Sequence, residues 1–136
     1  MGSEMRDRLQ WDVVIVEDED EIRDVLRLLF ELDDRFRVVA EASDGVAGIE
    51  AVAAHRPAAV VVDMGLPKAA GPDVIRAARQ SSPGTRIVVF SCFPDPFTLL
   101  DVLRLGADSY LDKATAWVDL LPTVAQLCSE DQTADA

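Results

Sequence analysis

Cysteine, histidine and basic residues are scarce in this chain. Its 136 residues include two cysteines, one histidine and 13 lysines and arginines, against 25 aspartates and glutamates. With only Cys92 and Cys128, a disulfide framework is not expected, and both thiols should stay reduced. The net charge of −12 argues against direct binding to nucleic acid or to an anionic membrane, because either surface needs clustered lysine and arginine.

Long apolar runs are also absent from the sequence. No run reaches the length of a transmembrane helix, and the first residues lack the basic start and apolar stretch of a secretory signal. We therefore expect a soluble, cytoplasmic protein without a membrane partner. The length suits one compact domain, and we divide the chain into an N-terminal extension (residues 1–10), the domain (11–128) and a polar C-terminal tail (129–136).

Apolar runs rich in valine, isoleucine and alanine alternate with segments whose apolar residues recur at helical spacing. Near-continuous apolarity in the central runs indicates strands buried on both faces, and hence a parallel sheet with helices crossing over it. The sequence therefore predicts a doubly wound α/β fold. The predicted strands are Asp12 to Val16, Arg37 to Glu41, Ala58 to Val62, Arg86 to Ser91 and Ser109 to Leu111.

Local signals predict where several helices begin and end. Ser43 is a candidate N-cap for the second helix, and Gly106 is a candidate terminator for the fourth. Pro122 falls inside the fifth helical segment, Trp117 to Leu127, where it removes a backbone hydrogen bond unless it lies in the first turn. We therefore expect this last helix to begin late or to kink.

Polar residues follow four of the five predicted strands. Glu17 and Asp18 follow the first strand, Asp63 the third, and Lys113 the fifth, while Ser91 ends the fourth. The carboxyl ends of parallel strands meet at one edge of the sheet, which is where ligands bind in such folds. Three carboxylates, a hydroxyl and an ammonium group at one edge suit a divalent metal together with a phosphoryl group.

Four motifs in order resemble the receiver domains of two-component response regulators, over nearly the whole chain. They are "IVEDE", "VVVDMGLP", "VVFS" and "GADSYLDK". The resemblance implies a flavodoxin-like fold, with five parallel strands in the order 2-1-3-4-5 and five helices. It also implies a signalling domain that is not an enzyme on other substrates and catalyses only its own phosphotransfer and dephosphorylation.

The resemblance assigns roles to three acidic residues of these motifs. Asp63 would accept a phosphoryl group from a partner histidine kinase. Glu17, Asp18 and Asp63 would bind a magnesium ion, and the backbone carbonyl of Gly65 would complete the protein's share of the ligands. Hard oxygen ligands of this kind are those that magnesium prefers.

Other residues in or near the motifs would assist the transfer or change position in response to it. Lys113 would neutralise charge on the phosphoryl oxygens, and Ser91 would donate a hydrogen bond to them. Ser91 and Tyr110 would form the switch, because movement of the hydroxyl toward the phosphoryl group vacates space that the tyrosine can fill.

Phe93, two positions beyond Ser91, would hinder the attacking water and slow the loss of phosphate. Ala114 departs from the family pattern, in which proline is usual after the lysine, so the loop geometry there differs from the usual one.

The output of the domain is predicted by similarity alone. The chain is either a stand-alone receiver or a receiver from a longer transcription regulator. The segment that includes "GADSYLDK" resembles receivers that precede a DNA-binding domain, which favours the second origin, and no such effector domain is present in this chain. The family expectation is a homodimer formed through the face of helix four, strand five and helix five.

Three other functions compete with this interpretation. A haloacid-dehalogenase-type phosphohydrolase needs a second aspartate where Gly65 stands. A flavodoxin-like electron carrier needs a phosphate loop rich in serine, threonine and glycine where this chain has "EDEDE". A receiver-like interaction module that acts without phosphorylation stays open.

Overall fold

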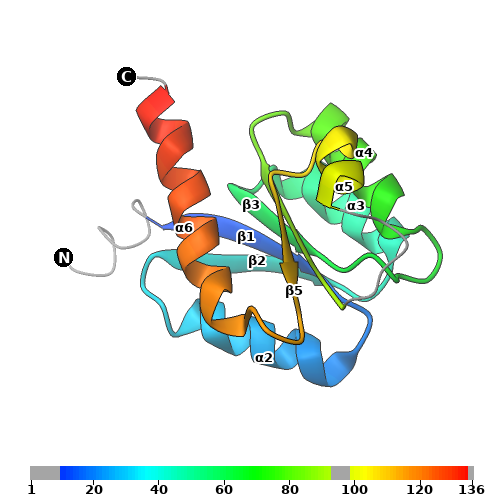
Figure 1. Ribbon diagram of the computed structural model, residues 1–136, viewed down its shortest axis with the longest axis horizontal. Coiled ribbons are helices and arrows are strands. Elements are labelled where there is room, and N and C mark those ends of the chain that lie inside the picture. The colour runs from blue at the N-terminus through cyan, green and yellow to red at the C-terminus, as the bar shows by residue number, and fades with distance from the viewer. Residues whose placement is uncertain (1–9, 93–98, 135–136) are drawn as a thin grey trace.

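The computed structural model describes residues 10–92 and 99–134, and within them one parallel sheet lies between two layers of helices (Figure 1). The strands are β1 (Trp11–Val16), β2 (Phe36–Ala42), β3 (Ala59–Val62), β4 (Arg86–Ser91) and β5 (Ser109–Asp112), and the helices are α2 (Asp20–Glu31), α3 (Gly45–His55), α4 (Gly71–Ser81), α5 (Leu99–Leu105) and α6 (Trp117–Ala134). The strand order is β2-β1-β3-β4-β5. The predicted fold class and strand order are therefore confirmed.

The valine-rich strands form the centre of the core because helices cover both of their faces. Val14 and Val16 of β1 pack in the cluster beneath α3, α4 and α5. Their neighbours Val13 and Ile15 point to the opposite face and pack beneath α2 and α6. All four residues of β3 are buried. This two-sided burial explains why residues 13–16 of β1 and the whole of β3 are continuous apolar runs rather than alternating ones.

The predicted strand bounds agree with the structure to within one residue, but the predicted cap of α3 is wrong. Asp44, not Ser43, is the N-cap, and its side chain accepts a hydrogen bond from the backbone N–H of Ala47 at 2.8 Å. Serine and aspartate cap helices about equally well. The sequence pattern alone could therefore not choose between two adjacent candidates.

The late start expected for α6 is also wrong, and the kink that was expected as the alternative stays a prediction. The helix begins at Trp117 and includes Pro122 beyond its first turn. The proline leaves the carbonyl of Val118 without its usual helical donor. Val118 is 83% exposed, so water can hydrate that carbonyl, which limits the cost of the missing bond. The helix also continues through residues 129–134, beyond the predicted segment.

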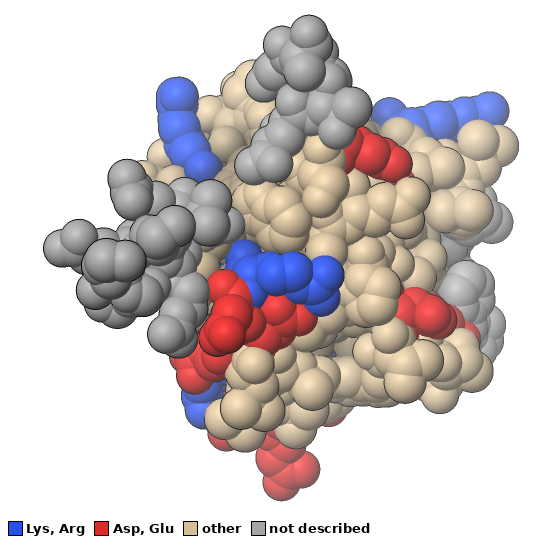
Figure 2. Space-filling view, turned by 90° about the vertical axis from the view of Figure 1, so that its left-hand side faces the viewer, with Lys and Arg blue, Asp and Glu red and all other residues tan. Residues whose placement is uncertain are grey.

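Among the described residues, no helix is both long enough and apolar enough to cross a membrane. Charges of both signs are mixed on the described part of the face shown in Figure 2, where lysines and arginines in the middle stand beside aspartates and glutamates. That part of this face shows no separate basic patch of the kind that nucleic-acid binding needs.

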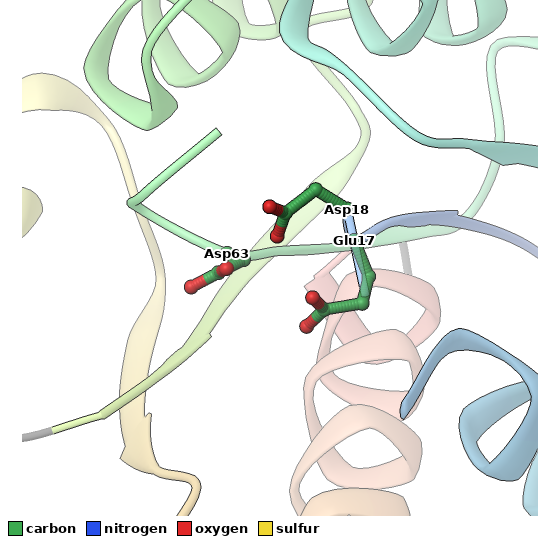
Figure 3. Close-up of side chains that lie close together, drawn as sticks. All are labelled: Glu17, Asp18 and Asp63. Carbon is green, nitrogen blue, oxygen red and sulfur yellow. The ribbon is translucent and has the colours of Figure 1, made fainter. Parts of the chain in front are cut away.

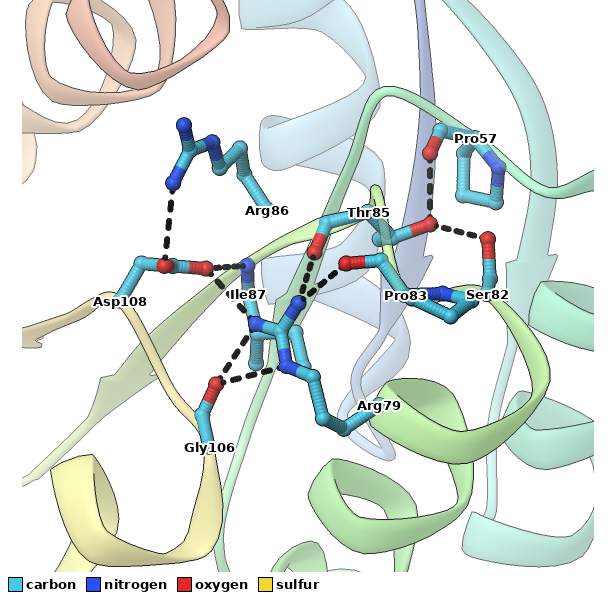
Figure 4. Close-up of polar contacts among 9 residues, drawn as sticks. All are labelled: Pro57, Arg79, Ser82, Pro83, Thr85, Arg86, Ile87, Gly106 and Asp108. Carbon is cyan, nitrogen blue, oxygen red and sulfur yellow. Dashed lines mark hydrogen bonds and ion pairs between the residues drawn. The ribbon is translucent and has the colours of Figure 1, made fainter. Parts of the chain in front are cut away.

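Arg79 of α4 joins three segments at the amino ends of β4 and β5 (Figure 4). Its guanidinium donates to the carbonyl of Gly106 at 2.6 and 3.2 Å and to the carbonyl of Thr85 at 3.0 Å. It also pairs with Asp108 at 3.0 Å, and the same carboxylate accepts from the backbone N–H of Ile87 at 2.7 Å. This network fixes the end of α5 and the start of β5 against β4.

An Arg79→Met variant is expected to unfold with a free energy lower by about 2 kcal/mol, since the buried carbonyls and Asp108 lose charged donors. Urea denaturation followed by circular dichroism measures this change. The matched control is Arg76→Met on the same helix, because Arg76 is 58% exposed and, within residues 10–92 and 99–134, pairs only with Asp73. Its effect should stay within about 0.5 kcal/mol. Equal effects of the two substitutions would contradict the role of the network.

Candidate metal and phosphoryl site

Three carboxylates converge at the carboxyl ends of β1 and β3. Each of Glu17, Asp18 and Asp63 offers an oxygen within 4.8 Å of those of the other two. Figure 3 shows the three side chains projecting to the same side of the strand ends. Oxygens at this spacing are close enough to share one divalent cation, and the donor set fits magnesium, which binds hard carboxylate oxygens and keeps several waters.

The sheet itself brings Glu17 and Asp63 together. The N–H of Asp63 donates to the carbonyl of Val16 at 3.1 Å, and the N–H of Glu17 donates to the carbonyl of Ala42 at 2.9 Å. These bonds continue the ladders of β1 with β3 and of β2 with β1 by one residue beyond the strand ends. The positions of both carboxylates therefore follow from strand register rather than from loop conformation.

Both carboxylate oxygens of Asp63 have a polar partner from the next strands. Ser91 Oγ donates to Asp63 Oδ1 at 2.9 Å. Lys113 Nζ lies 3.4 Å from Asp63 Oδ2 and 2.5 Å from Glu17 Oε1. The side chains of Glu17, Lys113 and Asp63 are 1%, 7% and 12% exposed, so little water screens these charges.

Burial and pairing change the pKa values of the two most buried groups of the site. Burial raises the pKa of Glu17, although Lys113 and the backbone N–H of Glu19 act in the opposite direction. Burial by itself lowers the pKa of Lys113, but the carboxylates of Glu17 and Asp63 outweigh it and the pKa is raised. Lys113 therefore remains an ammonium group at neutral pH and supplies positive charge beside Asp63.

Of the three other predicted positions, the structure describes two. Gly65, two residues beyond Asp63, is exposed, and no atom lies within 4 Å of the place that a side-chain Cβ would take. Tyr110 lies on β5 opposite Val89 of β4 and packs, partly buried, against the core cluster. Phe93 lies outside the described residues.

The turn after β5 contains a feature that the sequence analysis missed. The N–H of Ala114 donates to the side chain of Asp112 at 2.9 Å. A proline at position 114 has no N–H and could not make this bond. Asp112 thus stabilises the turn that carries Lys113, and an aspartate two residues before a non-proline position is the local signal for such a turn.

Arg23 is a second residue that the sequence analysis missed. Its guanidinium donates to the backbone carbonyl of Glu17 at 2.9 Å and pairs with Asp20 at 2.6 Å. The N–H of Glu19 donates to Glu17 Oε2 at 3.0 Å. These bonds hold the acidic segment after β1 in place and offset part of the repulsion among its carboxylates.

Comparisons with known proteins identify the family to which this fold belongs. The profile of the response regulator receiver domain family matches residues 13–125. The transcriptional regulatory protein DegU of Brevibacillus brevis is 30% identical over 117 residues, which cover 84% of this chain and 50% of the relative. The nitrate/nitrite response regulator protein homolog of Haemophilus influenzae is 31% identical over 126 residues, which cover 90% of this chain and 58% of the relative.

Solved structures show the same architecture. The REC domain of AraT, a response regulator from Geobacillus stearothermophilus, superposes with a TM-score of 0.80 at 29% identity, covering 93% of this chain and 98% of that one. A CheY-like response regulator receiver domain protein from Methanospirillum hungatei reaches a TM-score of 0.83 at 20% identity, covering 92% and 98%, a likeness that shows the fold alone.

The fold and the family match define a signalling domain of two-component systems. The chain belongs to the response regulator receiver domain family. It spans about half the length of the curated relatives it matches.

Proposed function

We propose that this domain accepts a phosphoryl group on Asp63 from a partner histidine kinase, with magnesium held by Glu17, Asp18, Asp63 and the carbonyl of Gly65. One observation carries the proposal. Asp63 is the carboxylate that contacts a hydroxyl and an ammonium group while lying beside two further acids. That combination suits a nucleophile whose product needs both a metal and hydrogen-bond donors.

The positions of the described side chains support this transfer. An oxygen of Asp63 attacks the phosphorus atom, an acyl phosphate bond forms, and the bond from phosphorus to the kinase histidine nitrogen breaks. Lys113, already 3.4 Å from Asp63, neutralises negative charge on the transferred group, and Ser91 Oγ donates to one of its oxygens. When bound, magnesium supplies further positive charge to those oxygens.

The switch would connect this event to the surface formed by α5, β5 and α6. Ser91 pairs with Asp112 across β4 and β5, and Tyr110 lies on the same strand as Asp112. Movement of Ser91 toward a phosphoryl group would therefore change the position of the Tyr110 side chain. Three leucines of α5 expose apolar surface, and we propose that they contribute to a phosphorylation-dependent homodimer: Leu99 (51% exposed), Leu100 (55%) and Leu103 (39%).

The output that we propose for the whole protein is transcription regulation. Curated relatives bear the names of transcriptional and nitrate/nitrite response regulators, and each is about twice the length matched here. A DNA-binding effector domain outside this chain would then respond to the phosphorylation state of the receiver.

The direct test is the intact mass of the protein after incubation with acetyl phosphate, with magnesium or with excess EDTA. We expect a mass gain of one phosphoryl group that requires magnesium and is lost on treatment with hydroxylamine, which cleaves acyl phosphates. If a folded protein gained no mass in either condition, the result would instead support an interaction module that acts without phosphorylation.

A further inference from the structure

We infer that Asp44 and Gly45, at the start of α3, are positioning residues for magnesium. The inference rests on the proposed function, because it concerns the loop of residues 64–70 that carries the Gly65 carbonyl. Neither residue belongs to the acidic cluster. Each nevertheless contacts this loop directly, and together they fix its path.

The first contact is a close approach of two backbones. The N–H of Gly45 donates to the carbonyl of Pro67 at 3.0 Å. A Cβ atom at position 45 would lie 1.8 Å from the carbonyl oxygen of Ala69. Any residue other than glycine would therefore push the loop away from α3, although the backbone of Gly45 has an ordinary helical conformation.

The second contact is made by the carboxylate that caps α3. One oxygen of Asp44 accepts from the N–H of Ala47 at 2.8 Å, and the other lies 3.5 Å from Lys68 Nζ. The cap bond, aided by Lys68, lowers the pKa of Asp44. Lys68 has a φ of 69°, a left-handed conformation that costs a non-glycine residue about 1 kcal/mol. A loop residue held in that conformation indicates that the loop is tightly constrained.

A second glycine joins the first residue of the loop to the start of α4. The N–H of Gly71 donates to the carbonyl of Met64 at 3.2 Å, and a Cβ at position 71 would lie 2.6 Å from Met64 Cα. Gly65 itself lies at an exposed point between these contacts. Its backbone carbonyl therefore belongs to the segment that these glycine contacts hold.

Magnesium is sensitive to such positioning because it demands near-octahedral geometry at short distances. A ligand displaced by a fraction of an ångström would weaken binding without removing any donor atom. Asp63 and Glu17 are placed by the sheet ladders, so the same displacement leaves the nucleophile where it is. Loss of the contacts with α3 should thus affect metal affinity more than the chemistry of transfer.

The test is titration calorimetry of Mg²⁺ into the wild type, Gly45→Ala and the control Gly84→Ala, whose Cβ would meet open space. We expect Gly45→Ala to raise the dissociation constant about 10-fold, the effect typical of residues that orient metal ligands, and Gly84→Ala to leave it unchanged. The half-saturating Mg²⁺ concentration for phosphorylation by acetyl phosphate should rise by the same factor, while the rate at saturating Mg²⁺ stays near that of the wild type.

The outcomes separate this inference from the proposed function. Equal Mg²⁺ affinity of the wild type and a folded Gly45→Ala would overturn the inference and leave the proposed function standing. A wild type that binds no Mg²⁺ would overturn both. If circular dichroism shows that Gly45→Ala does not fold, the inference is tested with Asp44→Ala instead, because this variant removes the cap and the Lys68 pair without a clash. We expect Asp44→Ala to bind Mg²⁺ more weakly than the wild type. An unchanged affinity of this variant would overturn the inference.

Discussion

Replacement of Lys113 by methionine is expected to reduce phosphorylation by acetyl phosphate about 100-fold, the loss typical when one charged donor to a transition state is removed. The same change should lower the unfolding free energy of the metal-free protein by about 3 kcal/mol, because it leaves the buried Glu17 without its cation. Magnesium should restore part of this stability, since it brings positive charge to the same carboxylates.

The pH dependence of this variant has a definite sign. Without Lys113, burial remains the main influence on Glu17 and holds its pKa further above the ordinary value. A group whose pKa is raised in the folded state contributes stability that is fully present below its pKa in the unfolded state. That contribution is lost as the pH rises through its pKa in the folded state. The variant should therefore recover stability relative to the wild type between pH 7 and pH 5.

Urea denaturation of the wild type, Lys113→Met and the control Lys68→Met at both pH values measures these changes. Lys68 is 70% exposed, so its replacement should change the stability by about 0.5 kcal/mol or less. A Lys113→Met protein as stable as the wild type at pH 7 would show that Glu17 does not depend on this ammonium group.

The second large effect is expected for Asp63→Asn, which should gain no phosphoryl group at any magnesium concentration. An amide oxygen is a poor nucleophile, and the neighbouring acids lack the hydroxyl contact that Ser91 makes with Asp63. Intact-mass spectrometry after incubation with acetyl phosphate measures the result. A full phosphoryl gain by this variant would show that another residue is the acceptor.

Asp18→Asn is the matched control, because it removes one negative charge from the same cluster but keeps the proposed nucleophile. Its phosphorylation should need more magnesium and should recover as the magnesium concentration rises. The contrast distinguishes a metal ligand from the acceptor. Two variants that responded identically to added magnesium would leave Asp63 with no role beyond metal binding.

The sequence was enough to predict the fold because its two periodicities are strong. Buried parallel strands such as β3 are continuous valine runs, and the intervening helices carry regular apolar stripes. The predicted strand ends then brought Glu17, Asp63, Ser91 and Lys113 to one edge, and the structure places these side chains in contact. The parallel arrangement of the strands was therefore enough to predict that these four residues lie together.

The features that were not predicted depend on contacts between distant segments or on a choice between similar residues. Asp44 and Ser43 are equivalent as caps until the path of the preceding loop is known. The close approach of Gly45 to Ala69 joins the start of α3 to a loop that periodicity does not describe. Pro122 lies within α6 at a place where the residue that loses its usual helical donor, Val118, is exposed. Solvent exposure of that kind cannot be read from the proline itself.

The most direct measurement is the chemical location of the phosphoryl group. The protein is incubated with acetyl phosphate and magnesium, treated with sodium borohydride, which reduces an acyl phosphate to an alcohol, and then digested and sequenced by tandem mass spectrometry. The account predicts homoserine at position 63 and aspartate or glutamate retained at positions 17 and 18. Homoserine at another acidic position, or phosphate retained on a serine or threonine, would contradict it.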